Sequence, residues 1–129
     1  MAVDALTVLQ ASVTKTATFN GAAFTLPGGT PRRGLKARVI YSAASTSSGA
    51  GSVTFGIDVS YDAGSTWNTD FQANAITLST TAAASEVYIP FEVSPTSVAN
   101  GIQIRPSIEA ISGTGATITY QVDLTISRP

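Results

Sequence analysis

The sequence of 129 residues carries seven basic and eight acidic side chains, and a net charge of −1 gives nucleic acid and anionic membranes no overall electrostatic attraction. It contains no Cys and no His, which excludes disulfides, thiol nucleophiles, the usual zinc and copper ligands and the commonest general base. Without these ligands we expect no cofactor or metal site. The length suits one domain, residues 1–129. Charged residues form only 12% of the chain, so we expect a surface made for contact with other subunits.

The first 20 residues do not have the pattern of a secretory signal peptide, because Asp4 precedes any basic residue and Lys15 is the first one. Weak alternation predicts short strands over residues 5–11 and 14–19, and we expect residues 1–20 to form an extended arm or an edge strand. No apolar run approaches the roughly 20 residues that a membrane span needs. We therefore expect neither a signal peptide nor a membrane span.

Four of the seven basic residues gather in the segment TPRRGLKAR: they are Arg32, Arg33, Lys36 and Arg38. Lys36 and Arg38 fall on the polar face of the strand that begins here, whereas the other two precede it. Such a patch is typical of a solvated face or of pairing with carboxylates of the same chain, and it also suits an acidic partner surface. No aromatic residue interleaves with the basic ones, which argues against nucleic acid as the partner.

The clearest strand runs from residue 52 to residue 61, where apolar side chains alternate with small or polar ones over ten residues. Further strong alternation occupies residues 35–41, 87–93, 102–108 and 118–126, and weaker candidates are 23–26, 67–71 and 74–79. Turn-forming residues separate these segments at 20–21, 27–29, 43–51, 62–64, 80–85, 94–101 and 112–115. Eight or more short strands spaced in this way predict an all-β fold, an antiparallel β-sandwich or jelly roll.

The octapeptide SYDAGSTW matches the Asp-box pattern Ser/Thr-x-Asp-x-Gly-x-Thr-Trp, at Ser60, Asp62, Gly64, Thr66 and Trp67. The pattern predicts a hairpin tip in which the Asp accepts backbone hydrogen bonds, the Gly takes a positive φ and the Trp begins the returning strand. Asp boxes recur on the blades of sialidase propellers, but a single copy in 129 residues cannot build a propeller. We interpret the motif as a structural hairpin, with sugar contact through Tyr61 and Trp67 as the alternative and catalysis as the least favoured interpretation.

Two prolines, Pro90 and Pro106, lie within alternating segments and cannot donate a ladder hydrogen bond. We therefore expect their strands to lie at sheet edges or to carry bulges. The one segment that allows a turn of helix is Pro95–Ala99.

The eight carboxylates are scattered along the chain, and no two are adjacent. A glycosidase would need two of them to meet in a cleft, as Asp58 with Asp123 or Glu92 with Glu109 would if their strands were neighbours. A calcium site is the other arrangement to consider, from Asp58, Asp62 and Asp70. The loop lacks the dense oxygen ligands of known calcium motifs, so we predict neither site and no enzymatic activity.

Four features of the chain point to one family: the start MAVDALTVLQASVTKTATFNG, a Ser/Thr/Ala-rich β chain without Cys or His, the hairpin VSYDAGSTW and the terminal strand ITYQVDLTISRP. Together they resemble small virion structural proteins of tailed bacteriophages, in particular capsid decoration or cement proteins. The resemblance implies a β-sandwich or jelly roll that assembles as a dimer or trimer. It also implies that the protein is located in the virion, assembled in the host cytoplasm, with the major capsid protein or other virion subunits as partners.

A sparsely charged sandwich with long exposed edges would aggregate as a monomer unless copies of itself or a lattice covered those edges. We therefore expect a non-enzymatic structural protein that stabilises the phage head by noncovalent contacts, with residues 1–20 reaching a neighbour and the basic patch pairing with acidic capsid groups. The alternative is a carbohydrate-binding β-sandwich module in which Tyr61, Trp67 and Asn68 form part of a glycan platform. Another phage head–tail or tail component is a further alternative.

Overall fold

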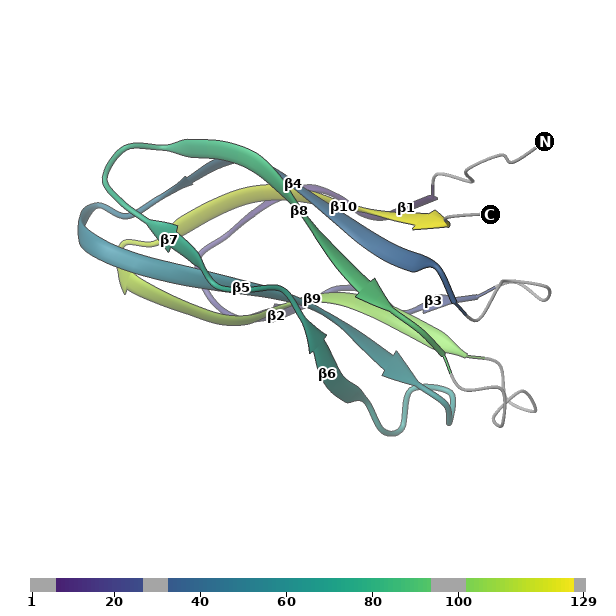
Figure 1. Ribbon diagram of the computed structural model, residues 1–129. Helices are drawn as coiled ribbons and strands as arrows, with labels where there is room; N and C mark the ends of the chain where they lie inside the picture. Colours follow the sequence, from purple (N-terminus) through teal and green to yellow (C-terminus); the bar gives the residue numbers. More distant parts are fainter. Residues whose placement is uncertain (1–6, 27–32, 94–101, 127–129) are drawn as a thin grey trace.

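The computed structural model describes residues 7–26, 33–93 and 102–126, and these residues form strands and the segments that connect them. Figure 1 shows the strands in two layers that pack face to face. The strands are β1 (Thr7–Lys15), β2 (Phe19–Asn20), β3 (Phe24–Thr25), β4 (Leu35–Ser45), β5 (Ser48–Ser60), β6 (Asn68–Gln72), β7 (Ile76–Leu78), β8 (Ala83–Phe91), β9 (Gln103–Thr114) and β10 (Thr117–Ile126).

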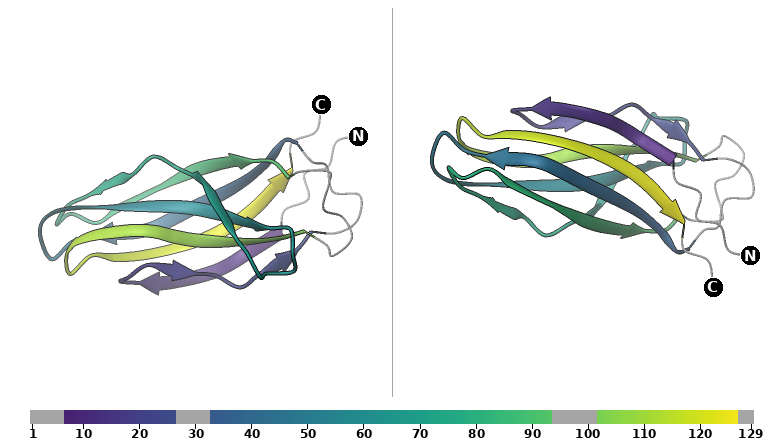
Figure 2. Two further views of the ribbon diagram at one scale, coloured as in Figure 1. Left: turned by 90° about the horizontal axis from the view of Figure 1, so that it is seen from below. Right: turned by 90° about the horizontal axis from the view of Figure 1, so that it is seen from above.

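In this part of the chain the first sheet has the strand order β1-β10-β4-β8, and the second has the order β2-β9-β5-β6. β3 also pairs with β9 and β7 with β5, and every pairing is antiparallel. Figure 2 shows the second sheet from below and the first sheet from above. The predicted all-β antiparallel sandwich of eight or more strands is confirmed.

The core lies between the sheets and is built from alternate residues of the long strands. On β5 the buried apolar side chains are Val53, Phe55, Ile57 and Val59. The Phe55 ring packs against Tyr120 of β10 with a centroid separation of 5.1 Å. Burial raises the pKa of Tyr120 to about 12, because water no longer stabilises the phenolate. Each fully buried large apolar side chain contributes about 1.5–3 kcal/mol, so the period of two decides which face of each strand is inside.

Several predicted turns are shorter than expected, because strands extend into 43–51, 80–85 and 112–115. The small residues in two of these segments allow strands to approach one another closely. A side chain added at Gly51 would overlap the backbone of β9, and one added at Gly113 would lie 2.9 Å from the Cα of Gly51. Small residues therefore mark tight strand packing here, rather than loops.

The two strand prolines differ in their settings. Pro90 lies on β8, an edge strand of the first sheet in the described part of the chain, as expected. Pro106 lies on β9, a central strand that carries a register shift against β5 near Glu109. The carbonyl of Pro106 accepts a hydrogen bond from the N–H of Gly21 at 2.7 Å, so its missing N–H faces the break between β2 and β3. The predicted helical turn at Pro95–Ala99 lies outside the described residues.

Residues 7–20 lie along the chain's own sheets. β1 pairs with β10 and β2 pairs with β9, each at an edge of its sheet, which agrees with the edge-strand alternative; residues 1–6 lie outside the described part. None of the described residues forms a helix with the length and hydropathy that a membrane span requires.

Candidate functional site

The octapeptide SYDAGSTW forms the tip of the β5–β6 hairpin, and the returning strand begins at Asn68, one residue later than expected. Asp62 Oδ1 accepts hydrogen bonds from the backbone N–H of Thr66 at 2.8 Å and from the hydroxyl of Ser60 at 2.9 Å. The hydroxyl oxygen of Ser60 accepts the backbone N–H of Gly64 at 2.8 Å. Side chains of the motif therefore satisfy backbone donors of the turn, as a hairpin tip requires.

The turn has two further physical consequences. Hydrogen bonds from the side chain and backbone of Thr66, and then from Ser60, lower the pKa of Asp62, because they favour its charged form. Ala63 and Gly64 are both left-handed, with φ of 60° and 94°. Glycine takes this conformation without strain, whereas it costs an alanine about 1 kcal/mol. The hydrogen bonds hold a turn that the backbone of Ala63 alone would not favour.

Trp67 packs against a charged pair on the outward face of the second sheet. The Cζ atom of Arg105, on β9, lies 4.2 Å from the centroid of the Trp67 ring. Arg105 Nε donates to Asp58 Oδ2 at 2.9 Å, and the Asp58 side chain is fully buried while that of Arg105 remains 20% exposed. The hydroxyl of Ser107 donates to Asp58 Oδ1 at 3.4 Å. Carboxylate, guanidinium and indole thus form one packed unit that fixes the plane of the guanidinium.

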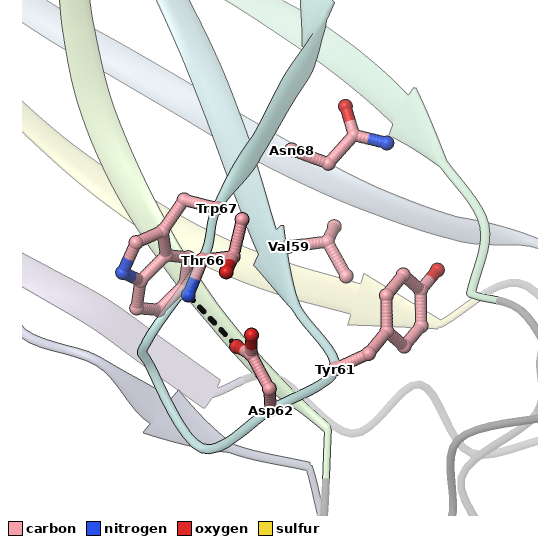
Figure 3. A pocket seen from close by; sticks show the side chains of 6 residues that line it. All are labelled: Val59, Tyr61, Asp62, Thr66, Trp67 and Asn68. Carbon is pink, nitrogen blue, oxygen red and sulfur yellow. Dashed lines mark hydrogen bonds between the residues drawn. The ribbon is translucent and has the colours of Figure 1, made fainter.

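An open pocket of about 480 Å³ adjoins the hairpin; its lining residues are Val59, Tyr61, Asp62, Thr66, Trp67 and Asn68. Figure 3 shows the Trp67 indole and the Tyr61 ring on opposite sides of the hairpin. The side-chain oxygen of Asn68 accepts the backbone N–H of Asp70 at 2.9 Å, which leaves the amide N–H donors of Asn68 without a partner among the described residues. The three residues of the predicted glycan platform therefore line one pocket, but their two rings do not form a flat surface.

The basic patch predicted at residues 32–38 is largely paired within the chain. Arg38 Nε lies 2.8 Å from Glu86 Oε2, and Arg33 Nε lies 3.9 Å from Glu92 Oε2. Lys36 Nζ lies 5.9 Å from the centroid of the Tyr88 ring. Arg32 lies outside the described residues. The side chains of Lys36 and Arg38 fall on the outward face of the first sheet, and pairing with carboxylates of the same chain is the alternative that these contacts favour.

Neither of the carboxylate pairs considered from the sequence forms. Asp58 and Asp123 lie on the outward faces of different sheets, and Glu92 contacts Arg33. Glu109 is the carboxylate near Asp58. Burial, together with the negative charge of Asp58, raises the pKa of Glu109. Among the described residues, no group of three His, Cys, Asp or Glu side chains is placed to hold a metal ion.

Sequence reasoning missed Gln72 and Arg105, and it paired Glu109 with Glu92, whereas the structure places Glu109 near Asp58 on the outward face of the second sheet. Gln72 Nε2 donates to Glu109 Oε2 at 3.4 Å. A signal did exist, since Asp58 and Arg105 carry opposite charges on the polar faces of two predicted strands. The sequence does not show, however, that these strands are neighbours with Asp58 opposite Arg105.

No protein-family model and no curated protein matches the sequence. Among solved structures, the chain is similar to one described as "CBM4 structure and function", with a TM-score of 0.50 and 10% identity over 96% of this chain and 86% of that chain. It is also similar to a family 11 carbohydrate-binding module from Clostridium thermocellum in complex with a β-1,3-1,4-mixed-linked tetrasaccharide, with a TM-score of 0.42 and 12% identity over 97% of this chain and 83% of that chain. The first likeness shows a shared β-sandwich fold.

Proposed function

We propose that the protein is a non-catalytic, carbohydrate-binding β-sandwich module whose ligand enters the pocket at the β5–β6 hairpin. The observation that carries this proposal is that Tyr61, Trp67 and Asn68 line one open pocket of about 480 Å³. A pocket of this size accommodates one or two sugar units. The sandwich fold shared with the structure described as "CBM4 structure and function" adds support.

The chemistry of the pocket suits sugars, which present both apolar C–H faces and hydroxyl groups. The two rings supply apolar contact area, the hydroxyl oxygen of Thr66 accepts hydrogen bonds, and the free amide donors of Asn68 donate them. Because the rings lie on opposite sides of the hairpin, they fit a short segment or the end of a glycan better than a long flat chain.

The carboxylate in the pocket is poorly suited to catalysis. Asp62 uses one oxygen to accept hydrogen bonds from Ser60 and Thr66. These bonds lower its pKa, so it does not hold a proton to donate at neutral pH. Its role in the pocket is to hold the hairpin and to accept hydrogen bonds from a ligand.

The test is a glycan panel followed by isothermal titration calorimetry with the best ligands. Tyr61→Ala and Trp67→Ala should each weaken binding about tenfold, and Asn68→Ala by less, because one hydrogen bond is worth less than a ring contact. Tyr88→Ala, an exposed aromatic residue on the other sheet, is the matched control and should bind normally. Failure of the wild-type protein to bind any glycan in a broad panel would refute the proposal. A folded Trp67→Ala variant that keeps full affinity would remove its central residue.

A second candidate is the virion structural role, which one feature of the first sheet favours. Both exposed large hydrophobic side chains in the described residues, Val8 and Tyr88, lie on its outward face, at 54% and 49% exposure. Strand register places them in one row with Asp123 and Arg38. Exposed apolar groups beside charged ones are typical of a surface that contacts another protein.

The virion role has its own test. The protein is mixed with purified empty phage heads, and sedimentation and resistance of the heads to heat are measured. Tyr88→Ala should reduce co-sedimentation, whereas Trp67→Ala should not. No sedimenting complex and no gain in heat resistance would rule out decoration of those heads.

A further inference from the structure

Outside the hairpin pocket, the outward face of the second sheet carries a cluster of hydrogen-bonding side chains, which we call the polar strip. Its residues come from three adjacent strands and are Gln72, Asp58, Arg105, Ser107 and Glu109. Asp58 is the cross-strand partner of Arg105, and Gly56 is the partner of both Ser107 and Gln72. Trp67 joins the strip to the pocket, because it contacts Arg105 and also lines the pocket.

The residue at the centre of the polar strip is a glycine, so the backbone there carries no side chain. Gly56 occupies this position, and a Cβ atom added there would lie 2.8 Å from the Cγ atom of Glu109. The Glu109 side chain therefore lies across the strand, where the amide of Gln72 meets its carboxylate. A larger residue at position 56 would displace Glu109 and separate it from Gln72.

Hydrogen-bonding groups of the strip are held in fixed positions and are partly unused. The Nε of Arg105 is taken by Asp58, but its terminal nitrogens have no partner among the described residues, and the Trp67 ring holds the guanidinium plane. The exposed Gln72 donates from Nε2 to the carbonyl of Thr69 at 3.1 Å and to Glu109, which leaves its side-chain oxygen as an acceptor. Donors on β9 and an acceptor on β6 thus lie on one face of the sheet, and both kinds of group match hydroxyl groups, since each hydroxyl both donates and accepts.

The charge of the strip disfavours an anionic ligand. Asp58 and Glu109 carry two negative charges when ionised, against one positive charge on Arg105. The exposed Asp70 lies two residues from Gln72 on β6 and adds a further negative charge. A carboxylate or sulfate on a ligand would therefore meet net repulsion, whereas an uncharged polyhydroxyl chain would not.

We propose that the polar strip binds successive units of an uncharged oligosaccharide whose end occupies the hairpin pocket. This inference rests on the proposed function and names the ligand class, a neutral glycan rather than an acidic one. Gln72 and Arg105 are the residues that contact the additional sugar units. The strip thus extends recognition from one or two sugars to a longer chain.

The test compares ligands of equal length by isothermal titration calorimetry. The probes are neutral hexose disaccharides and tetrasaccharides of several linkages, and digalacturonate and tetragalacturonate. We expect a neutral tetrasaccharide to bind more tightly than its disaccharide, and about tenfold more tightly than tetragalacturonate. Gln72→Ala should weaken tetrasaccharide binding about fivefold and leave disaccharide binding unchanged, because only the longer chain reaches the strip.

Controls separate this inference from the proposed function. Gln10→Ala removes a glutamine on β1 and should leave both affinities unchanged. Arg105→Lys tests the guanidinium, and if that variant does not fold, the exposed Gln72 carries the test alone. Equal or tighter binding of tetragalacturonate would overturn the inference, as would unchanged tetrasaccharide binding by Gln72→Ala when Tyr61→Ala loses it. Both results leave the pocket function standing, whereas no glycan binding by the wild type overturns both.

Discussion

The outward faces of the two sheets stabilise a buried carboxylate through different partners. Each has a buried aspartate, Asp58 on the second sheet and Asp123 on the first. Asp58 binds the guanidinium of Arg105, which in turn stacks on an indole. Asp123 accepts a hydrogen bond from the amide of Gln121 at 3.0 Å, while Arg38, its cross-strand partner, contacts Glu86 instead. One face therefore pairs its buried carboxylate with a guanidinium in a packed unit, whereas the other gives it an amide partner and keeps its Arg–Glu ion pair partly exposed.

This difference separates a face that is built to hold side chains in place from one that is open to contact. Fixed groups favour recognition of small ligands with defined geometry, because little side-chain entropy is lost on binding. The first sheet exposes the apolar side chains of Val8 and Tyr88, beside an ion pair that is itself partly exposed. If the two faces differ in this way, equivalent substitutions on them should change stability by different amounts.

Breaking the buried ion pair between Asp58 and Arg105 should have the largest effect on stability. Asp58→Ala leaves the mostly buried guanidinium of Arg105 without a counterion, so the free energy of unfolding should fall by about 3–5 kcal/mol. Glu86→Ala, which removes the partner of the more exposed Arg38, should cost about 0–1 kcal/mol. Chemical denaturation measures both. Equal losses in the two variants would show that the faces do not differ in this respect.

Removing an aromatic ring from each face should have the next largest effect. Trp67→Ala should lower the free energy of unfolding by about 2–3 kcal/mol, because the ring is partly buried against Arg105. Tyr88→Ala should change it by less than about 0.5 kcal/mol, since that ring is half exposed. Thermal unfolding of the two variants gives the comparison, and a larger loss for Tyr88→Ala would reverse our assignment of the packed face.

The hairpin should be sensitive to acid. The folded-state pKa of Asp62 lies below its ordinary value of 3.8, so its stabilising contribution is present above that value and is lost as the pH falls through the folded-state pKa. Asp62→Ala should therefore be less stable than wild type at neutral pH, and the gap should narrow on acidification. Ser65→Ala, in the same turn, serves as the uncharged control. A stability difference that stays constant with pH would argue against the charged Asp62 as the group that holds the turn.

The smallest effect on stability should come from Glu109, and its dependence on pH should be opposite to that of Asp62. Burial, with the charge of Asp58, raises its folded-state pKa, so its contribution to stability is present below the ordinary value of 4.5 and is lost as the pH rises through the folded-state pKa. Glu109→Gln should therefore be slightly more stable than wild type at neutral pH and similar to it in acid. Melting temperatures measured across this pH range decide the matter, and a destabilised variant at neutral pH would contradict it.

Much of the fold could be predicted because alternate residues of a strand face the core, which gives the sequence an apolar period of two. The run from Val53 to Val59 is the clearest case, since every second residue lies in the core. Strand ends were less predictable. Gly51 and Gly113 look like loop residues, yet they allow two strands to touch, and local composition does not distinguish these situations.

The candidate site was predictable only where its residues are close in sequence. The motif from Ser60 to Trp67 specifies its own turn through local hydrogen bonds, so it could be recognised in advance. Arg105 lies 47 residues from Asp58, and its role depends on the register of β5 against β9. Local patterns do not encode such a register, because it is set by packing of the whole sheet.

Trp67 is the only tryptophan in the chain. Its ring packs against Arg105 on the sheet and also lines the pocket. Its fluorescence therefore reports on a single place in the molecule without any label. A ligand in the pocket, a shift of the Arg105 guanidinium and opening of the hairpin would each alter the surroundings of the same indole. The protein thus carries a built-in spectroscopic probe at the point where its two proposed binding surfaces meet.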